Sequence, residues 1–319
     1  MENKVKIISM DTVEAEEIKW LWKPYVPFGK LTIIQGDPGD GKTTFALHIA
    51  SLLSQGKCFD EAGDMGMFEP VNVIYQTAED GLADTVKPRL ISAGADCSKI
   101  KVIDDSEKSL SMNDERLEIA IKETGAKLLI LDPLQAYLGD RIDMNRANEA
   151  REMTKKLGAL AERTGCAVVL IGHMNKGSGA KAAYRGIGSI DFYAIARSVL
   201  LVAKVPQNPN IRAVAQIKSN LAAEGETMAF QLDENGFTWI GEYDISAEEL
   251  LAGCSNSDKR KTAEDFLRKI LANGQMVSAS SIFAQARSIG VSKRTIENVK
   301  QELGIKSIKN GASWLWKMD

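Results

Sequence analysis

Short aliphatic runs alternate with longer, more polar stretches over the first half of the chain. The runs are four to seven residues long and predict buried strands at 31–35, 71–77, 101–104, 127–132 and 166–172. The stretches between them predict helices at 43–55, 84–93, 113–123 and 145–163. This alternation is typical of an α/β fold with a mostly parallel sheet and helices on both of its faces.

Beyond residue 190 the alternation ends. Successive strands are predicted at 197–204, 211–218, 228–232 and 237–240. Small polar residues predict a linker at 253–258, between a core at 1–252 and a small C-terminal unit at 259–319. The unit contains three short helical patterns, at 259–272, 278–288 and 292–303. A basic segment with Trp314 and Trp316 completes the outline of a winged helix, in which we expect both tryptophans to fill the core.

The charge is unevenly distributed, although the net value at pH 7 is only −3. Residues 255–319 contain 12 lysines and arginines against 6 acidic residues, whereas residues 1–254 contain 28 against 37. A basic end on an acidic body indicates a nucleic-acid partner at that end. Ordinary solvated lysines would give the same balance.

Several classes of protein are disfavoured by the composition. No apolar run reaches the roughly 18 residues of a membrane span, and the first residues lack the pattern of a secretory signal. The cysteines are scattered, which disfavours a disulfide framework or a zinc site, at Cys58, Cys97, Cys166 and Cys254. The two histidines, His48 and His173, leave little scope for histidine-based metal chemistry. We therefore expect a cytoplasmic protein without a membrane partner.

The most specific motif fits the phosphate-binding (Walker A) pattern G-x-x-x-x-G-K-[ST] between a predicted strand and a predicted helix. Its glycines let the backbone wrap a phosphate chain, so that several N–H groups face the anion. Lys42 adds a positive charge, and Thr43 adds a hydroxyl ligand for Mg²⁺. We therefore predict ATP and Mg²⁺ as ligands. The predicted nucleotide-binding residues are Gly36, Asp37, Pro38, Gly39, Asp40, Gly41, Lys42, Thr43 and Thr44.

Three further side chains stand where predicted strands end. Asp132 ends an aliphatic run, and we expect it to hold Mg²⁺ beside the phosphate loop. Glu79 follows the strand at 71–77, which we expect to neighbour the phosphate-loop strand, so that Glu79 orients and deprotonates water; Asp80 is its substitute. The alternative for Glu79 is a charge that stabilises a helix N-terminus. His173 can sense the γ-phosphate from the end of its strand, although a lone histidine is more often structural.

Residues 15–242 resemble the RecA-like ATPases, and among them the plasmid and phage replicative helicases of the RepA kind. The resemblance rests on the motifs above and on the run that begins His173-Met174-Asn175-Lys176, passes through Ala183-Tyr184-Arg185-Gly186 and ends Ala196-Arg197-Ser198-Val199. It implies a RecA-like phosphate-loop core, a ring that is usually a hexamer, ATP sites between subunits and a channel for single-stranded DNA. That family usually consists of the core alone, so the C-terminal unit is an addition.

The resemblance also implies two basic residues that act on the neighbouring subunit. Arg197 resembles the arginine finger, which reaches the neighbour's γ-phosphate, and Lys218 begins a stretch similar to one in RecA recombinases that carries two inter-subunit lysines. Asn220 replaces the second lysine, which disfavours a recombinase. As alternatives, Arg197 pairs with a carboxylate of its own subunit and Lys218 is a solvated charge at a strand end.

Two groups of basic residues are candidates for DNA contact. The first group is interspersed with glycines after the sensor strand, and we expect it to hold single-stranded DNA by its phosphates: Lys176, Lys181 and Arg185. An ordinary solvated loop would have the same composition. The second group lies on the last predicted helix and would meet duplex DNA, with Lys306 and Lys309 on the wing: Lys293, Arg294 and Lys300. Docking to a replication protein is the alternative for this unit.

Two functions fit these observations. The first is an ATP-hydrolysing, ring-forming single-stranded DNA translocase or replicative helicase of a mobile element. The second is an ATP-gated DNA-binding module without unwinding activity. The complete nucleotide motifs favour hydrolysis in both, whereas no motif encodes strand separation.

Overall fold

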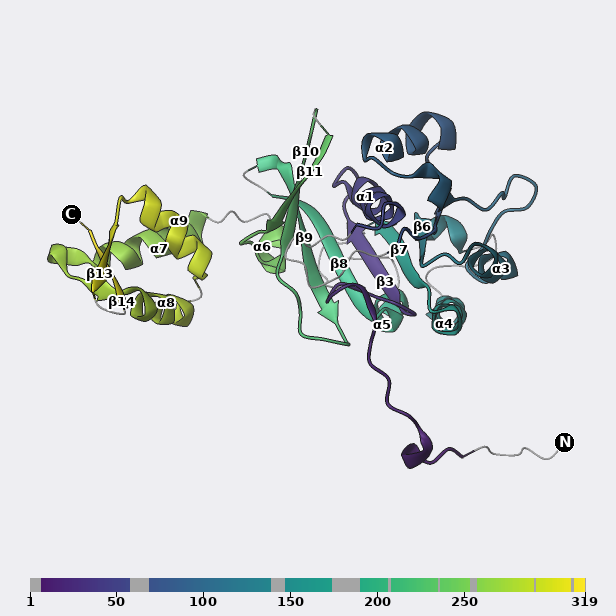
Figure 1. Cartoon of the computed structure of the whole chain (residues 1–319), viewed down its shortest axis with the longest axis horizontal. Coiled ribbons are helices and arrows are strands. Elements are labelled where there is room, and N and C mark those ends of the chain that lie inside the picture. Colours follow the sequence, from purple (N-terminus) through teal and green to yellow (C-terminus); the bar gives the residue numbers. More distant parts are fainter. Residues whose placement is uncertain are drawn as a thin grey trace.

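A nine-stranded sheet forms the centre of the computed structural model, which describes residues 7–57, 69–138, 147–173, 190–205, 208–234, 236–252, 257–289, 291–310 and 313–318 (Figure 1). In spatial order its strands are β11 (Gly236–Glu242), β10 (Met228–Asp233), β9 (Asn208–Ser219), β8 (Ser198–Val205), β3 (Leu31–Gly36), β7 (Ala167–His173), β6 (Leu128–Asp132), β4 (Val73–Thr77) and β5 (Ile100–Lys101). Strands β8 to β5 run parallel, and β9, β10 and β11 add an antiparallel edge. The predicted α/β class with a mostly parallel sheet is confirmed.

The order of the strands corrects one expectation. We expected β4 to lie beside β3, but β7 and β6 separate the two strands. The neighbours of β3 are instead β7 and β8, so that Gln35 lies opposite both Gly172 and Leu201. Local pattern does not give this order, because a helical crossover can pass over several strand positions before the chain rejoins the sheet. Since β4 is parallel to β3, its carboxyl end still faces the same edge as the phosphate loop.

Helices cover both faces of the sheet. Helices α1 (Lys42–Ser54) and α2 (Lys87–Ser92) lie above the sheet in Figure 1, and α3 (Glu115–Thr124), α4 (Ala147–Thr164) and α5 (Ile190–Ile195) lie below it. Successive side chains along each strand point to opposite faces of the sheet, and so the strands contribute side chains to two separate hydrophobic clusters. On β3, Ile34 joins the cluster of α1 and α2, whereas Ile33 joins the cluster of α3, α4 and α5.

Aromatic packing joins the antiparallel edge to α1. The Phe45 ring of α1 stacks on Phe230 of β10, with ring centroids 5.6 Å apart, and lies 6.4 Å from the Trp239 ring of β11. Trp22 contacts Phe45 from the small hairpin of β1 (Trp20–Trp22) and β2 (Val26–Pro27). A β-carbon placed on Gly41 would lie 3.4 Å from the Phe230 ring. The β10–β11 hairpin therefore packs against the end of the phosphate loop, where α1 begins.

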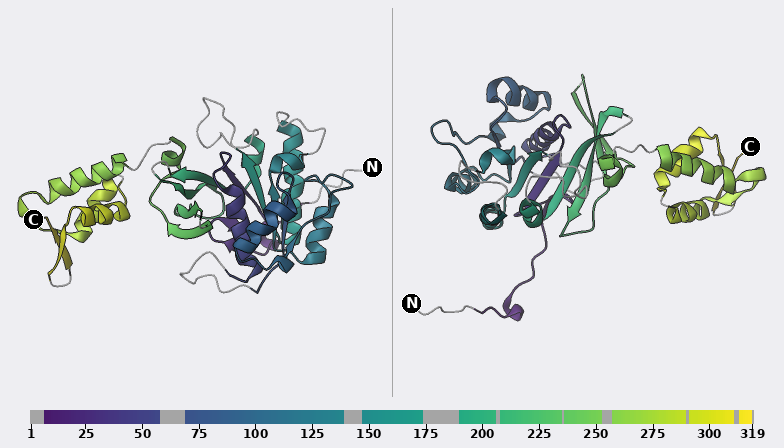
Figure 2. Two further views of the ribbon diagram at one scale, coloured as in Figure 1. Left: turned by 90° about the horizontal axis from the view of Figure 1, so that it is seen from above. Right: turned by 180° about the vertical axis from the view of Figure 1, so that it is seen from behind.

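The residues from 257 onward are the yellow-green and yellow elements near the C-terminus in Figure 2. Their buried side chains form a hydrophobic cluster of their own. These residues fold as α7 (Ser257–Ile270), β12 (Val277–Ser278), α8 (Ala279–Ser288), α9 (Lys293–Glu302), β13 (Lys306–Asn310) and β14 (Ser313–Lys317), with the three strands in the order β12-β14-β13. Trp316 is buried in this cluster against Phe283, as expected. The expectation for Trp314 is wrong, since it is 53% exposed. Trp314 lies opposite Lys309, nearer the tip of the hairpin than Trp316.

Several elements differ in extent from their predicted ranges. The helix predicted at 84–93 begins with a π-helical turn at Leu82–Val86 before α2, and the strand predicted at 101–104 is only the two residues of β5. Sequence pattern did not predict β1, β2 or α6 (Ala247–Ala252), which are all short. Helix α7 begins inside the predicted linker. In the described ranges, no helix is both long and apolar enough to span a membrane.

Candidate nucleotide site

The backbone of the phosphate loop requires glycine for two different reasons. At Gly36 a β-carbon would lie 2.1 Å from the carbonyl oxygen of Val202 in β8, so no side chain fits there. Gly39 and Gly41 have φ angles of 81° and 88°, in the left-handed region that other residues rarely adopt. The loop thus turns tightly between β3 and α1, and it leaves the unpaired N–H groups of the first helical turn at the end of β3.

Lys42 is almost completely buried at the start of α1. Its ammonium group donates hydrogen bonds to the carbonyl oxygens of Gly36 at 2.9 Å and Asp37 at 2.8 Å. Burial lowers the pKa of Lys42, and the neighbouring carboxylates, Asp40 first among them, oppose that shift. The charge is therefore held within the curve of the loop, where an anionic ligand can replace the carbonyl partners.

Asp132, at the carboxyl end of β6, accepts hydrogen bonds from two hydroxyl groups. Its Oδ2 atom accepts a hydrogen bond of 2.7 Å from the Thr43 hydroxyl and one of 2.9 Å from the Tyr75 hydroxyl. Burial raises the pKa of Asp132, and the two hydrogen bonds favour the ionised form. Sequence reasoning assigned no role to Tyr75. The sequence did contain a signal for it. Tyr75 stands in a predicted buried strand, and a buried Tyr hydroxyl usually requires a hydrogen-bond partner.

This arrangement fits Mg²⁺ but does not enclose it. Thr43 and Asp132 place a hydroxyl and a carboxylate oxygen side by side, and Mg²⁺ prefers oxygen ligands. Mg²⁺ usually takes only one or two protein ligands and completes its shell with water and substrate phosphates. The described part of the chain contains no group of three or more His, Cys, Asp or Glu residues that could hold a metal.

The structure distinguishes Glu79 from Asp80. The Asp80 carboxylate accepts a hydrogen bond of 2.9 Å from Arg89 of α2, and this ion pair holds it. Glu79 instead lies 4.0 Å from His173, measured from its Oε2 atom to the imidazole Nε2 atom. Its side chain is 66% exposed, and so it has room to turn. The histidine Nδ1 atom is buried without a hydrogen-bond partner among the described residues. The ends of β4 and β7 thus bring together the two residues predicted to act near the γ-phosphate.

Arg197 and Lys218 lie at the opposite edge of the sheet from the phosphate loop of their own subunit. The Arg197 amide donates to the carbonyl oxygen of Leu31, at the start of β3, and the phosphate loop begins at the far end of that strand. The length of β3 puts about 17 Å between the two points. Within the described residues, the exposed Arg197 side chain forms no ion pair.

Lys218, in contrast, is occupied within its own subunit. Its ammonium group donates to the carbonyl oxygens of Tyr193 at 2.5 Å and Ala194 at 3.1 Å, at the end of α5. It also lies 4.9 Å from the centre of the Tyr193 ring. Burial and the nearby charge of Arg197 lower the pKa of Lys218. These contacts tie the end of α5 to β9, and the inter-subunit role of Lys218 stays a prediction.

The three basic residues of α9 that are predicted to contact duplex DNA make contacts within the chain. Lys293 lies over the ring of Phe283, and Lys300 donates a hydrogen bond of 2.6 Å to Ser307. Arg294 donates to the carbonyl oxygen of Glu242, in β11 of the core. The residues predicted to contact single-stranded DNA lie outside the described residues: Lys176, Lys181 and Arg185.

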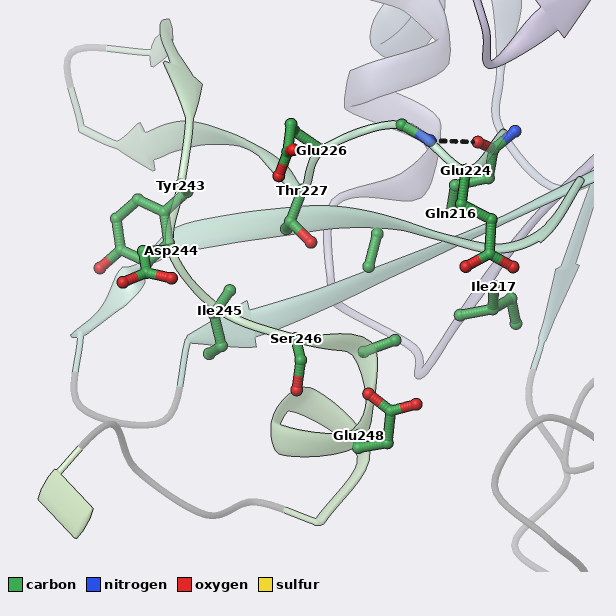
Figure 3. A pocket seen from close by; sticks show the side chains of 13 residues that line it. Gln216, Ile217, Glu224, Glu226, Thr227, Tyr243, Asp244, Ile245, Ser246 and Glu248 are labelled. Carbon is green, nitrogen blue, oxygen red and sulfur yellow. Dashed lines mark hydrogen bonds between the residues drawn. The ribbon is translucent and has the colours of Figure 1, made fainter. Parts of the chain in front are cut away.

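A hollow of about 420 Å³ lies away from the phosphate loop, against β9 and the start of α6 (Figure 3). The N–H group of Gly225 donates a hydrogen bond of 2.8 Å to the Gln216 side chain at its rim. Carboxylates dominate the charged groups of its lining: Glu224, Glu226, Asp244 and Glu248. Such a lining repels phosphate, which leaves the phosphate loop as the better nucleotide site.

Comparison with known proteins shows the family to which the chain belongs. A family model described as "AAA domain" matches residues 2–179. The DNA repair protein RadA of Halalkalibacterium halodurans is 25% identical over 285 residues, which cover 87% of this chain and 55% of that protein. RadA of Streptococcus pneumoniae is 23% identical over 283 residues, which cover 88% of this chain and 60% of that protein. The chain therefore spans a little over half the length of these relatives.

Two solved structures share the fold. A KaiC-like protein from Pyrococcus horikoshii superposes with a TM-score of 0.51 at 19% identity, covering 70% of this chain and all of that one. A solved ATPase domain superposes with a TM-score of 0.50 at 16% identity, covering 66% of this chain and 84% of that one. The chain belongs to the AAA domain family, and its core has a RecA-like fold with a phosphate-binding loop.

Proposed function

We propose that this protein hydrolyses ATP as a ring, with six subunits as the expected number, and uses it to move along single-stranded DNA as a replicative helicase of a mobile element. The observation that carries the proposal is the division of the basic groups between two edges of one sheet. Lys42 lies in the phosphate loop, whereas the backbone of Arg197, whose side chain is exposed, lies at the other end of β3, about 17 Å along the strand. Head-to-tail contact would bring Arg197 of one copy to the loop of the next, and such contacts form a ring when the rotation between copies closes.

The chain supplies the groups that hydrolysis requires. The loop amides and Lys42 hold the phosphates, and Thr43 and Asp132 hold Mg²⁺. Bound Mg²⁺ would neutralise charge on the phosphate oxygens. Glu79 orients the attacking water and accepts its proton. His173, 4.0 Å from Glu79, connects this event to the segment that follows β7.

DNA is the proposed partner on two grounds. The similar RadA proteins are named for DNA repair, and the segment after His173 combines glycines with basic residues. Removal of the three charges at Lys176, Lys181 and Arg185 should lower the salt dependence of single-stranded DNA binding by about 0.7 in slope for each lost phosphate contact. An unchanged slope in the triple alanine variant would place the DNA elsewhere.

Subunit mixing tests the shared site. Lys42→Ala and Arg197→Ala proteins should each be almost inactive, because the first lacks a working loop and the second lacks the finger for its neighbour. In an equal mixture, about a quarter of the interfaces would combine an intact loop with an intact finger, so part of the ATPase activity should return. Full turnover by Arg197→Ala, or by wild-type protein that stays monomeric in saturating ATP, would contradict the shared site.

A second candidate function is ATP-gated DNA binding without unwinding. It is favoured by the C-terminal elements, whose order of helices and antiparallel strands fits the predicted winged helix, a fold that can recognise duplex DNA. A forked substrate distinguishes the two functions. Strand separation that requires hydrolysable ATP supports the helicase. DNA binding that depends on ATP but produces no separation supports the gated module.

A further inference from the structure

The phosphate loop is surrounded by more negative than positive charge. Asp37 and Asp40 belong to the loop itself, and Asp132 and Glu79 also act electrostatically on Lys42. An incoming triphosphate would add several further negative charges. A second cation near the loop would therefore favour nucleotide binding, and the phosphate-loop motif itself supplies only Lys42.

Strand β8 places a lysine at this position. It runs beside β3. Its Val202 carbonyl oxygen lies so close to Gly36 that only glycine fits at that position. Val202 faces the cluster that contains α1. Because side chains alternate along a strand, Lys204 points to the same face, just beyond the end of β3. A β-carbon placed on Gly39 would lie 3.8 Å from the Lys204 ammonium nitrogen.

Asp40 lies between the loop and this lysine. Its Oδ2 atom accepts a hydrogen bond of 3.0 Å from the Asp37 amide, and its Oδ1 atom is 4.0 Å from the Lys204 ammonium. The Asp40 side chain is only 11% exposed, whereas that of Lys204 is 43% exposed. Burial raises the pKa of Asp40, and Lys204 opposes that rise more strongly than Lys42 does. Arg212, opposite Lys204 on β9, is directed instead to the carbonyl oxygens of Pro209 and Leu232.

We propose that Lys204 is a positioning residue for nucleotide binding: it neutralises Asp40 and holds that carboxylate on the β8 side of the loop, away from the phosphates. The inference rests on the proposed ATP site and adds a residue to it. Lys204 acts on the ligand through Asp40, and its own contact with phosphate is not required. Without Lys204, the unpaired carboxylate would repel the phosphates from within the loop.

A double-mutant cycle tests this role in the full-length protein. The ligand is the β,γ-imido analogue of ATP with Mg²⁺, and its affinity is measured by calorimetry. Lys204→Ala should weaken binding about fivefold, a moderate effect because the lysine is partly exposed. Asp40→Asn should bind at least as tightly as wild type, since the Asn side-chain oxygen can still accept from the Asp37 amide. The Lys204→Ala/Asp40→Asn protein should match Asp40→Asn, because the lysine has lost the charge on which it acts.

Controls separate this role from a general loss of structure. Lys122→Ala removes an ion-paired lysine of α3, 2.7 Å from Glu118 and far from the loop, and should leave the affinity unchanged. In turnover, Lys204→Ala should raise KM for ATP and leave kcat close to wild type. If the same fivefold loss persists in the Asp40→Asn background, Lys204 contacts the phosphates directly and the inference is wrong. Failure of wild type to bind the analogue would overturn the nucleotide site itself, whereas equal binding by wild type and Lys204→Ala would overturn only the role of the lysine.

Discussion

Thr43 and Asp132 are 89 positions apart in the sequence, and the threonine hydroxyl donates a hydrogen bond of 2.7 Å to the aspartate carboxylate. This bond connects the first residues of α1 to the end of β6. The oxygen that accepts it also accepts the Tyr75 hydroxyl of β4. Three elements therefore fix the orientation of one carboxylate, and that carboxylate is the proposed protein ligand of Mg²⁺.

Replacement of Tyr75 by phenylalanine tests this orienting role. The change removes one donor to Asp132 and leaves the ring in the core, where Tyr75 is fully buried. We expect the ATPase to need several times more Mg²⁺ for half-maximal activity, because partners that orient a metal ligand typically contribute roughly 10-fold or more to metal affinity. The measurement is a Mg²⁺ titration of turnover at constant ATP.

Tyr25→Phe provides the matched control. Tyr25 donates a hydrogen bond of 2.6 Å to the Glu226 carbonyl oxygen and does not contact Asp132. It should alter stability without altering the Mg²⁺ requirement. Similar Mg²⁺ curves for wild type and Tyr75→Phe would remove Tyr75 from the metal site.

Glu79 and Asp80 should respond differently to loss of charge. Glu79→Gln should keep nucleotide binding and lower kcat by about 100-fold or more, because an amide does not accept the proton of the attacking water. Asp80→Asn should keep most of kcat, since its carboxylate is bound by Arg89. Single-turnover hydrolysis and nucleotide affinity are measured on both variants. The reverse ranking would assign the base to Asp80.

Sequence predicted those parts of the site that local spacing determines. Gly36 to Thr43 are contiguous, and Asp132 ends a strand whose aliphatic side chains mark burial on both faces. Because parallel strands end at one edge of a sheet, these two motifs could be expected to meet. The position of His173 beside Glu79 follows from the same rule.

The parts that sequence did not predict depend on long-range pairing. The separation of β4 from β3 is set by how two later strands insert between them. Lys204 approaches the loop because β8 pairs with β3, which no local pattern around residue 204 indicates. The sequence pattern around Lys218 is that of an exposed strand end. In the structure, its ammonium group donates hydrogen bonds to two carbonyl oxygens of α5. To predict any of these features, one would need to know how strands far apart in the sequence pair with one another.

His48 should make stability depend on pH. It lies in α1 against Phe237, with ring centroids 3.8 Å apart, and burial lowers its pKa to about 4. The unfolded chain binds a proton near pH 6.5, whereas the folded protein does so only near pH 4. Stability is therefore complete above pH 6.5 and is lost as the pH falls from 6.5 toward 4. Urea unfolding of wild type and His48→Phe at about pH 7 and about pH 5 measures this effect, and an equal loss of stability in both proteins would exclude His48 as its source.

The core also contacts the start of α9, where the C-terminal elements would meet DNA. The Ser292 hydroxyl donates a hydrogen bond of 2.5 Å to Asp244, and the Thr295 hydroxyl donates to the same carboxylate oxygen. Arg294 donates to Glu242 and lies 6.0 Å from the centre of the Tyr243 ring. A carboxylate thus occupies the N-terminal end of the helix, which otherwise favours phosphate.

Loss of Asp244 should therefore increase the affinity of the full-length protein for duplex DNA. In Asp244→Ala the Ser292 and Thr295 hydroxyls lose their acceptor in the core, which releases the start of α9. Several-fold tighter binding is expected in a titration near physiological salt. Glu248→Ala is the control, because it removes one exposed negative charge from the same hollow and has no hydrogen bond to the described residues of α9. Equal gains in the two variants would mean that net charge, not release of the helix, controls binding. If neither variant nor wild type binds any duplex with salt-sensitive affinity, the C-terminal unit is better explained as a docking site for a replication protein, because winged helices also mediate protein contacts.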